Sequence, residues 1–243
     1  MEKTNTTSQA LAVNVQGLTK AFGNHLVLRG IDLEIRHGQS VVIFGPNGAG
    51  KTTLIKVLAT IMRPSSGIAL VDGLNLKDNA EEIRRRIGVV AHQTFLYSNL
   101  TAYENLEFYS RLYDVPRRNE RIHEVALKVG MTSRLQDRVS TFSRGMQQRL
   151  SIARVLLHKP AIMLLDEPET GLDQQAISMF WNTLETEREE KRTIILTTHN
   201  LEQGLELGER LLILNKGQII YEGSKQTLDL AGLKEAYTHS TKD

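Results

Sequence analysis

The 243-residue sequence contains no cysteine. Disulfides, thiol catalysis and thiolate metal sites are therefore excluded, and the composition fits a reducing compartment. A surplus of one charge is also missing, because 30 basic and 28 acidic side chains give a formal net charge of only +2. Strong binding to nucleic acid usually relies on a basic surplus, so nothing in the composition points to nucleic acid as an obligate partner.

Long apolar runs are absent as well. No run approaches the roughly 18–20 residues that are needed to cross a bilayer, and the polar first ten residues lack the apolar core of a signal peptide. We expect a soluble, cytoplasmic chain that begins with a loose tail over residues 1–12. A chain of 243 residues, 40% of them hydrophobic, suffices for one large α/β domain or for a domain with a subdomain.

The most specific pattern is the stretch SVVIFGPNGAGKTTLIKVL at residues 40–58. Its β-branched start predicts a buried strand at 41–44, and its end predicts a helix at 51–58. The loop between them spells G-x-x-x-x-G-K-T. Glycines let such a loop aim several backbone N–H groups at one point, and the helix start adds its positive dipole end. The sequence therefore predicts a nucleoside triphosphate site.

The residues that we expect to bind the phosphates are Gly45, Pro46, Asn47, Gly48, Ala49, Gly50, Lys51, Thr52 and Thr53. Lys51 would supply a cation to the β- and γ-phosphates, and the Thr52 hydroxyl can ligate Mg²⁺. An ordinary glycine turn before a lysine is the alternative. The strand before the loop and the helix after it favour the phosphate site.

The rest of the chain alternates between strand and helix patterns. We expect strands or strand pairs at 13–35, 68–73, 87–93, 161–168, 193–199 and 210–223, and helices at 80–86, 174–189 and 200–208. Between about 92 and 158 apolar residues recur at helical spacing, which predicts an inserted helical subdomain whose last helix covers 143–158. Residues 224–243 end polar, and we expect them to form a tail that frays.

Two carboxylates end the apolar run IMLLDE at residues 162–167. In P-loop ATPases a carboxylate at this place holds Mg²⁺ indirectly, and its neighbour can orient and deprotonate the attacking water. We assign the first role to Asp166 and the second to Glu167. Solvated acids at a strand end are common by themselves, but the phosphate loop in the same chain favours the catalytic interpretation.

Two further side chains follow predicted buried strands. Gln93 could reach a metal or a water molecule, although a single glutamine is usually just a polar residue on the surface. His199 ends the strand pattern TIILTTH, and such strand ends lie near the nucleotide edge of an α/β sheet. The remaining histidines show no spacing that is typical of metal ligands.

In order along the chain, these motifs resemble those of the ATP-binding subunit of ABC transporters, over about residues 13–223. GPNGAGKTT matches the phosphate loop, Gln93 the Q-loop, and FSRGMQQRLSIAR at 142–154 the signature segment. IMLLDEP matches the acidic strand, GLD at 171–173 the D-loop, and TTH the switch histidine. The resemblance implies an α/β P-loop NTPase fold with the inserted helical subdomain and an antiparallel β subdomain.

The resemblance also implies cofactors and partners. ATP and Mg²⁺ would be bound in a head-to-tail dimer with a second copy or a close paralogue, between the phosphate loop of one subunit and Ser143 and Gly145 of the other. Asp173 of the D-loop would join that site, and Gln93 would act on metal and water. Dimer closure and opening would drive integral membrane subunits, so the chain would lie peripherally on the cytoplasmic face of the inner membrane.

Three features depart from the family pattern. The usual signature L-S-G-G-Q is FSRGM here, with Arg144 and Met146 among the changes. Phe22 stands where the adenine-stacking residue is usually tyrosine, which keeps the aromatic face and loses the hydroxyl. Glu169 stands where threonine is common, and the sequence offers no physical account of that change.

Three stretches look more narrowly like the haem-exporter ATPases of cytochrome c maturation: 58–67, 87–113 and 142–160. In that subfamily ATP hydrolysis is linked to the release of haem from its periplasmic chaperone. Nothing in the chain resembles a haem site, so we expect no direct haem binding and assign haem to the partners. The alternatives are the ATPase of another exporter, for a drug, lipid or polysaccharide, and a soluble ABC ATPase of an assembly scaffold such as that for iron–sulfur clusters.

The segment beside Gln93 faces the membrane partner in this family. Its apolar residues His92, Phe95, Leu96 and Tyr97 could meet that partner or could pack inside the helical subdomain. The sequence leaves both interpretations open.

Overall fold

The structure is a computed structural model that describes residues 11–91, 93–169 and 174–242. The strands are β1 (Leu11–Phe22), β2 (His25–Arg36), β3 (Ser40–Phe44), β4 (Ser66–Val71), β5 (Leu74–Asn75), β6 (Ile87–Val90), β7 (Ile162–Asp166), β8 (Thr193–Thr197), β9 (Arg210–Asn215) and β10 (Gln218–Ser224). The α-helices are α1 (Lys51–Leu58), α2 (Ala80–Arg86), α3 (Ala102–Leu112), α4 (Arg118–Lys128), α5 (Arg144–Leu156), α6 (Gln174–Glu189), α7 (Leu201–Leu207) and α8 (Leu230–Thr241). Short 3₁₀ turns cover Thr132–Arg134 and Val139–Thr141.

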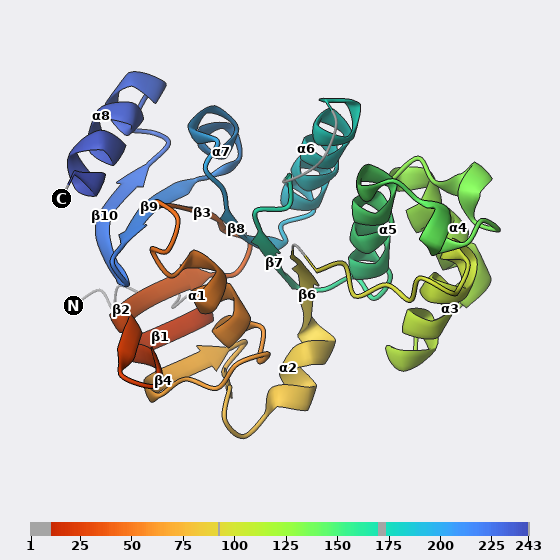
Figure 1. The fold of residues 1–243 in the computed structure, drawn as a ribbon, viewed down its shortest axis with the longest axis horizontal. Helices are drawn as coiled ribbons and strands as arrows, with labels where there is room; N and C mark the ends of the chain where they lie inside the picture. Colours follow the sequence, from red (N-terminus) through yellow and green to blue (C-terminus); the bar gives the residue numbers. More distant parts are fainter. Residues whose placement is uncertain (1–10, 92, 170–173, 243) are drawn as a thin grey trace, which may run out of the picture.

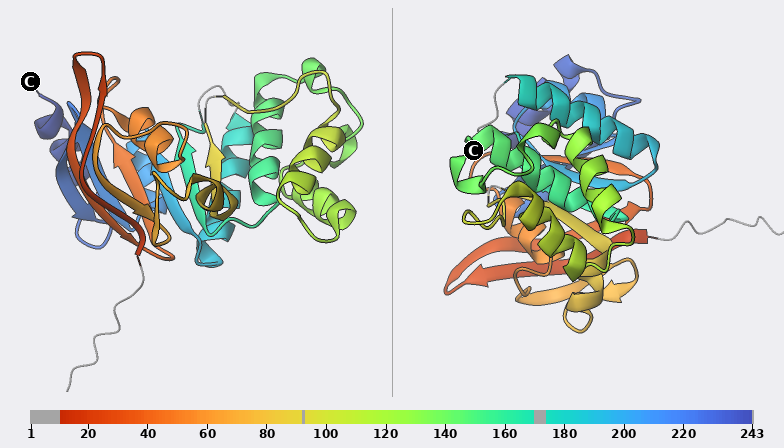
Figure 2. Two further views of the ribbon diagram at one scale, coloured as in Figure 1. Left: turned by 90° about the horizontal axis from the view of Figure 1, so that it is seen from below. Right: turned by 90° about the vertical axis from the view of Figure 1, so that its right-hand side faces the viewer.

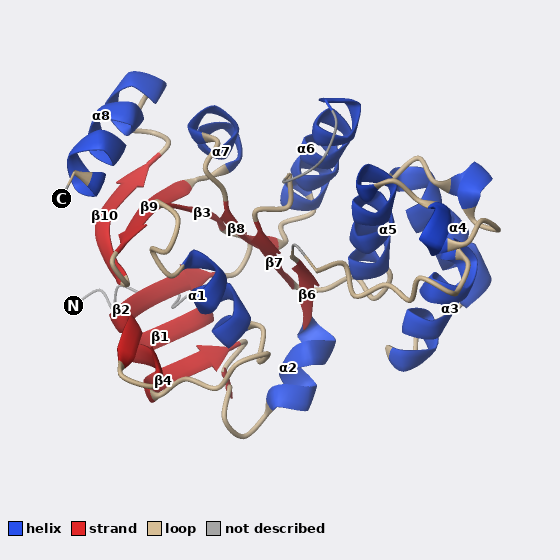
Figure 3. Ribbon diagram, in the orientation of Figure 1, coloured by secondary structure: helices blue, strands red, loops and turns tan. Residues whose placement is uncertain are grey.

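The strands form two sheets, which Figure 3 shows beside each other. The smaller sheet has the order β2-β1-β4-β5 and is antiparallel. The larger has the order β10-β9-β3-β8-β7-β6, with parallel pairing throughout except for the antiparallel edge strand β10. Strands β3, β7 and β8 are buried along their whole length, as their continuous apolar runs require in a covered parallel sheet.

The large sheet separates two apolar cores. Because side chains alternate along a strand, Val41 and Ile43 of β3 face the core that contains α1 and the antiparallel sheet. Val42 and Phe44 face the opposite core, which contains apolar side chains of α3 to α8. The phosphate loop leaves β3 between these two layers and is therefore supported from both sides.

The predicted helical insertion is present as α3, α4 and α5, which extend from one end of the sheet (Figures 1 and 2). Helix α3 begins with a capping box, in which Thr101 and Glu104 satisfy each other's backbone N–H groups. Helix α5 begins after Ser143, as predicted, and ends at Leu156 rather than at His158. Its inner face is buried against the other two helices and the sheet.

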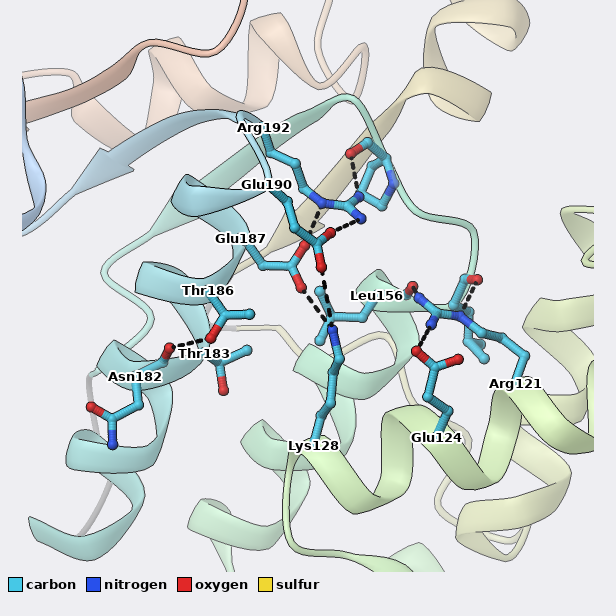
Figure 4. Close-up of polar contacts among 12 residues, drawn as sticks. Arg121, Glu124, Lys128, Leu156, Asn182, Thr183, Thr186, Glu187, Glu190 and Arg192 are labelled. Carbon is cyan, nitrogen blue, oxygen red and sulfur yellow. Dashed lines mark hydrogen bonds and ion pairs between the residues drawn. The ribbon is translucent and has the colours of Figure 1, made fainter.

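A buried carboxylate joins this helical group to the sheet side of the molecule (Figure 4). Glu187 of α6 is 1% exposed, and its Oε1 lies 3.4 Å from Nζ of Lys128 on α4. Arg192 pairs with Glu187, donates to the Glu190 carboxylate at 2.9 Å, and donates to the Pro160 carbonyl at 2.8 Å. The ionic network therefore ties α4 to α6 and to the start of β8.

The expected fraying tail after residue 224 is wrong for most of its length. Residues 230–241 form α8, which packs against α7, β9 and β10. Asp229 caps its first turn by accepting from the Gly232 N–H at 2.8 Å, and Leu233 is fully buried. Leu233 and Tyr237 share one helix face, so this helix contributes to the larger core.

Other boundaries also differ from the predictions. Residues 11 and 12, assigned to the first tail, belong to β1. Strands β6 and β8 end at Val90 and Thr197, so Gln93 and His199 lie in the loops that follow. No helix of the described residues is both long and apolar enough to span a bilayer.

Candidate functional site

The phosphate loop has a backbone that only glycine fits at two points. Gly45 has φ of +155° and Gly50 has φ of +106°. A Cβ on Gly45 would lie 2.1 Å from the Leu214 carbonyl oxygen, and one on Gly50 would lie 2.9 Å from a methyl carbon of Leu28. Strand β9 and strand β2 therefore press the loop into its curve, and helix α1 starts directly after it at Lys51.

Lys51 lies inside this curve and is only 5% exposed. Its Nζ donates to the carbonyls of Gly45 at 2.7 Å and Pro46 at 3.2 Å, and lies 3.2 Å from Oε1 of Glu167. A buried ammonium needs such partners, since burial without them would cost several kcal/mol. The contacts hold the cation between the phosphate loop and the predicted catalytic carboxylate.

Two of the three predicted metal ligands, Thr52 and Asp166, meet at the end of β7. Asp166 is 5% exposed, and its Oδ1 accepts from the Thr52 hydroxyl at 3.1 Å and from the Thr197 hydroxyl at 2.8 Å. Hydroxyl and carboxylate oxygens are the donors that Mg²⁺ prefers. Among the described residues, no group of three or more histidine or acidic side chains could hold a metal ion.

Glu167 has φ of +44°, a conformation that is strained for any residue other than glycine. Its N–H donates to the carbonyl of Thr197 at 3.0 Å and to the hydroxyl of Thr197 at 3.1 Å. These two bonds to the neighbouring strand maintain the strained backbone. The Glu167 side chain is 29% exposed, which leaves its carboxyl group accessible to a substrate.

Thr52, Gln93, Asp166 and Glu167 line a cavity of about 540 Å³. The rest of the lining consists of Lys56 and of the apolar residues Ile55, Ile61, Met62, Val89, Ala91 and Phe95. The structure thus brings four of the predicted site residues to one cavity, with Lys51 adjacent.

The other predicted residues lie outside this cavity's lining. Ser143 is exposed, and its hydroxyl caps α5 by accepting from the Met146 N–H at 3.3 Å, while Gly145 is buried. Phe22 is 47% exposed, with Nζ of Lys20 5.0 Å from its ring centre. His199 is exposed in the loop after β8.

Asp173 and His92 lie outside the described residues. The chemical roles that the sequence assigns to the predicted site residues stay predictions. What the structure adds is their placement relative to one another.

Two residues near the site escaped the sequence predictions. Thr197 pairs with Asp166 in the parallel register of β7 and β8, and it holds both carboxylate residues through its hydroxyl. Gln148 of α5 donates to the Pro168 carbonyl at 3.0 Å, which connects the signature helix to the acidic loop. Thr197 stands inside the motif TTH, so adjacent parallel strand ends were the signal that could have identified it.

The segment after β6 is anchored to the helical subdomain. Arg154 of α5 donates to the Val89 carbonyl at 2.7 Å, and its guanidinium lies 5.6 Å from the ring centre of Phe95 and 5.1 Å from that of Tyr109. The Tyr109 hydroxyl bonds the carbonyl of Phe95. Burial lowers the pKa of Arg154 and raises that of Tyr109.

The packing interpretation holds for two of the apolar residues beside Gln93. Phe95 lies against Arg154, and Leu96 packs on the core of the helical subdomain. Tyr97 is 50% exposed and contacts the edge of Phe108, itself 42% exposed.

Comparisons with known proteins agree with this geometry. A family model described as "ABC transporter" matches residues 28–170. The ABC transporter ATP-binding protein NatA of Bacillus subtilis (strain 168) is 37% identical over 204 residues, which cover 83% of each chain. The linearmycin resistance ATP-binding protein LnrL of the same strain is 34% identical over 218 residues, covering 89% of this chain and 70% of that one.

Two further proteins similar to this chain are an export protein and a protein of solved structure. The Nod factor export ATP-binding protein I of Cupriavidus metallidurans is 34% identical over 218 residues, covering 89% of this chain and 72% of that one. The dimeric post-hydrolysis structure of the ATP-binding cassette MJ0796 bound to ADP and Pi has a TM-score of 0.82 at 28% identity, covering 89% of this chain and 100% of that one. The chain therefore belongs to the ABC transporter family and is one of its ATP-binding, ATP-hydrolysing subunits.

Proposed function

We propose that this chain pairs head to tail with a second copy or a close paralogue and uses ATP hydrolysis to drive the membrane subunits of an exporter. The observation that carries the proposal is the cavity lined by Thr52, Gln93, Asp166 and Glu167 beside the buried ammonium of Lys51. Such an arrangement serves to bind a polyphosphate, a divalent cation and an attacking water at one place.

Within one subunit, the phosphate loop would bind the β- and γ-phosphates through its backbone N–H groups and the Lys51 ammonium. The Thr52 hydroxyl and the Asp166 carboxylate would hold Mg²⁺, Asp166 through water. When bound, Mg²⁺ supplies charge neutralisation at the phosphates.

Glu167 would accept the proton of the attacking water, and its partly exposed carboxyl beside Lys51 suits that role. Gln93, which lines the same cavity, would orient the same water and ligate the metal. His199, exposed in the loop after β8, would contact the γ-phosphate side of the site.

The second half of the site would come from the other subunit. Ser143 is exposed at the start of the 13-residue helix α5, and unpaired N–H groups and the helix dipole favour an anion there. Arg144 adds an exposed cation next to it. Phe22 offers an exposed ring to the adenine, and Asp173 keeps the D-loop role that the resemblance implies.

Export is supported by the names of two relatives, a resistance protein and an export protein. We assign the chain a peripheral position on the cytoplasmic face of the membrane, where its membrane subunits would hold it. The haem-exporter hypothesis is a narrower form of this proposal and uses the same ATP site. Partner identity distinguishes it from export of another cargo, since the ATP site would be the same in either case.

The proposal is tested with tagged Glu167→Gln protein, recovered with ATP from detergent-solubilised membranes. The co-purified chains are identified by mass spectrometry, and the eluate is scanned for a haem absorbance band. Multi-span partners would support the exporter, and a haem band with them would support the narrower hypothesis. Recovery of soluble scaffold chains alone would contradict a transport function. Tagged Lys51→Ala protein is the matched control, because it should not close on ATP.

A further inference from the structure

Glu169 is a buried carboxyl group that the mechanism above does not use. It follows the catalytic segment by two residues, its side chain is 8% exposed, and it occupies the family position where threonine is common. Its Oε1 accepts a short hydrogen bond from the hydroxyl of Thr198. Its Oε2 has no hydrogen-bond partner among the described residues. A buried, half-satisfied carboxyl is costly to keep, which calls for a reason beyond packing.

The partner of Glu169 is the residue next to His199. Thr198 is fully buried, and its hydroxyl accepts from the Asn200 N–H at 2.9 Å while it donates to Glu169. Asn200 in turn caps α7 by accepting from the Gln203 N–H at 3.1 Å. The Thr198 hydroxyl therefore connects the acidic loop to the turn over residues 198–200, which presents His199.

The bonds of Glu167 and Glu169 connect the ends of β7 and β8. The Glu167 N–H reaches back to Thr197, and the Thr198 hydroxyl reaches forward to Glu169. A threonine at position 169 carries its hydroxyl on Cβ and lacks the reach of a glutamate. The second bond therefore depends on the departure from the family pattern.

We propose that Glu169 is a positioning residue for His199, because its carboxyl fixes the Thr198 hydroxyl and thereby the turn that presents the imidazole to the nucleotide. Burial raises the pKa of Glu169, and the Thr198 hydroxyl and the charge of His199 oppose that rise. The inference rests on the proposed function, because it requires His199 to act on ATP.

The test measures ATP turnover and ATP affinity of Glu169→Ala, His199→Ala and the double variant. Displacing a catalytic group slightly can cost up to roughly a hundredfold in rate, so we expect Glu169→Ala to lower kcat by roughly ten- to hundredfold with little change in KM. In the His199→Ala background the same substitution should have no further effect. An equal loss in that background, or a loss of ATP affinity, would overturn the inference.

Two more variants keep the test decisive if Glu169→Ala folds poorly. Glu169→Gln keeps a carbonyl oxygen that can accept from Thr198, so it should restore most of the turnover. Thr198→Val removes the hydroxyl with little change in shape and should reproduce the loss. Full turnover in Thr198→Val would contradict the proposal.

The outcome is separable from that of the proposed function. Glu167→Gln reports on ATP hydrolysis itself, and its co-purified partners report on transport. If Glu167→Gln loses turnover as expected while Glu169→Ala and Thr198→Val keep it, only the role of Glu169 fails.

Discussion

The phosphate loop and the signature segment are both assigned to the proposed ATP site, yet their contacts within one subunit differ. Lys51 is buried inside the phosphate loop and has three oxygen partners within one subunit. Ser143 is exposed, and its described hydrogen bond is the cap of its own helix. The phosphate loop thus has its partners within one subunit, whereas the signature segment leaves Ser143 accessible to a second subunit. A single subunit should therefore bind ATP, and a second subunit should be needed to turn it over.

The largest effect on ATP turnover is expected from a change at Glu167, beside the phosphate loop. Glu167→Gln removes the carboxylate that would accept the proton of the attacking water, so turnover should fall by roughly two orders of magnitude or more. ATP binding and dimer closure should persist, since the amide keeps the size of the side chain. Steady-state ATPase assays beside equilibrium ATP binding check this, and unchanged turnover would exclude the role given to Glu167.

Lys51→Ala should instead weaken ATP binding to a single subunit. Loss of a charge-assisted contact to the phosphates is worth about 1.5–3 kcal/mol, which corresponds to a decrease in ATP affinity of roughly ten- to hundredfold. Fluorescence titration of the isolated chain with a labelled ATP analogue measures it. Lys77→Ala, an exposed lysine in the turn after β5 and outside the lining of the cavity, is the matched control. Normal affinity in Lys51→Ala would refute the role of the ammonium.

Ser143→Asp tests the second element of this comparison, the signature segment. Aspartate is a good N-cap, so α5 should persist, but its charge would repel the γ-phosphate of the partner's ATP. We expect ATP affinity of the isolated chain to stay normal, while ATP-dependent dimerisation and turnover fall by roughly tenfold or more. Light scattering of the Glu167→Gln protein with and without this second change measures dimerisation. Ser143→Thr keeps both the cap and the hydroxyl and should dimerise normally.

The smallest effect is expected at the ionic network far from the loop. Lys128→Met removes one partner of the buried Glu187 but leaves Arg192, so the free energy of unfolding should fall by about 1–2 kcal/mol. Urea unfolding measures it, with Arg117→Met as the control, because the pair of Arg117 and Glu120 is exposed at 82% and 73%. A surface pair contributes roughly 0–1 kcal/mol at most. An equal loss in both variants would contradict the special role of the network.

Much of the site could be predicted because its residues are adjacent in sequence or end adjacent strands. Gly45, Gly50, Lys51 and Thr52 follow one buried strand, so their geometry is local. Asp166 and Glu167 also follow a buried strand, and parallel strands deliver such ends to one edge. Thr197 escaped prediction because its role depends on the strand register, and Gln148 because its role depends on a contact between α5 and the acidic loop.

The sequence by itself determined the phosphate loop, the acidic strand end, the helical insertion and the family, because each is written in a continuous stretch of characteristic residues. Tertiary structure decided the rest. Residues 230–241 form helix α8, because apolar side chains such as Leu233 pack against a core surface that the local sequence pattern does not predict. Glu169 acquired its partner Thr198, 29 positions away, because two strand ends meet there. Contacts between distant segments depend on packing, and packing exists only once the sheet has formed.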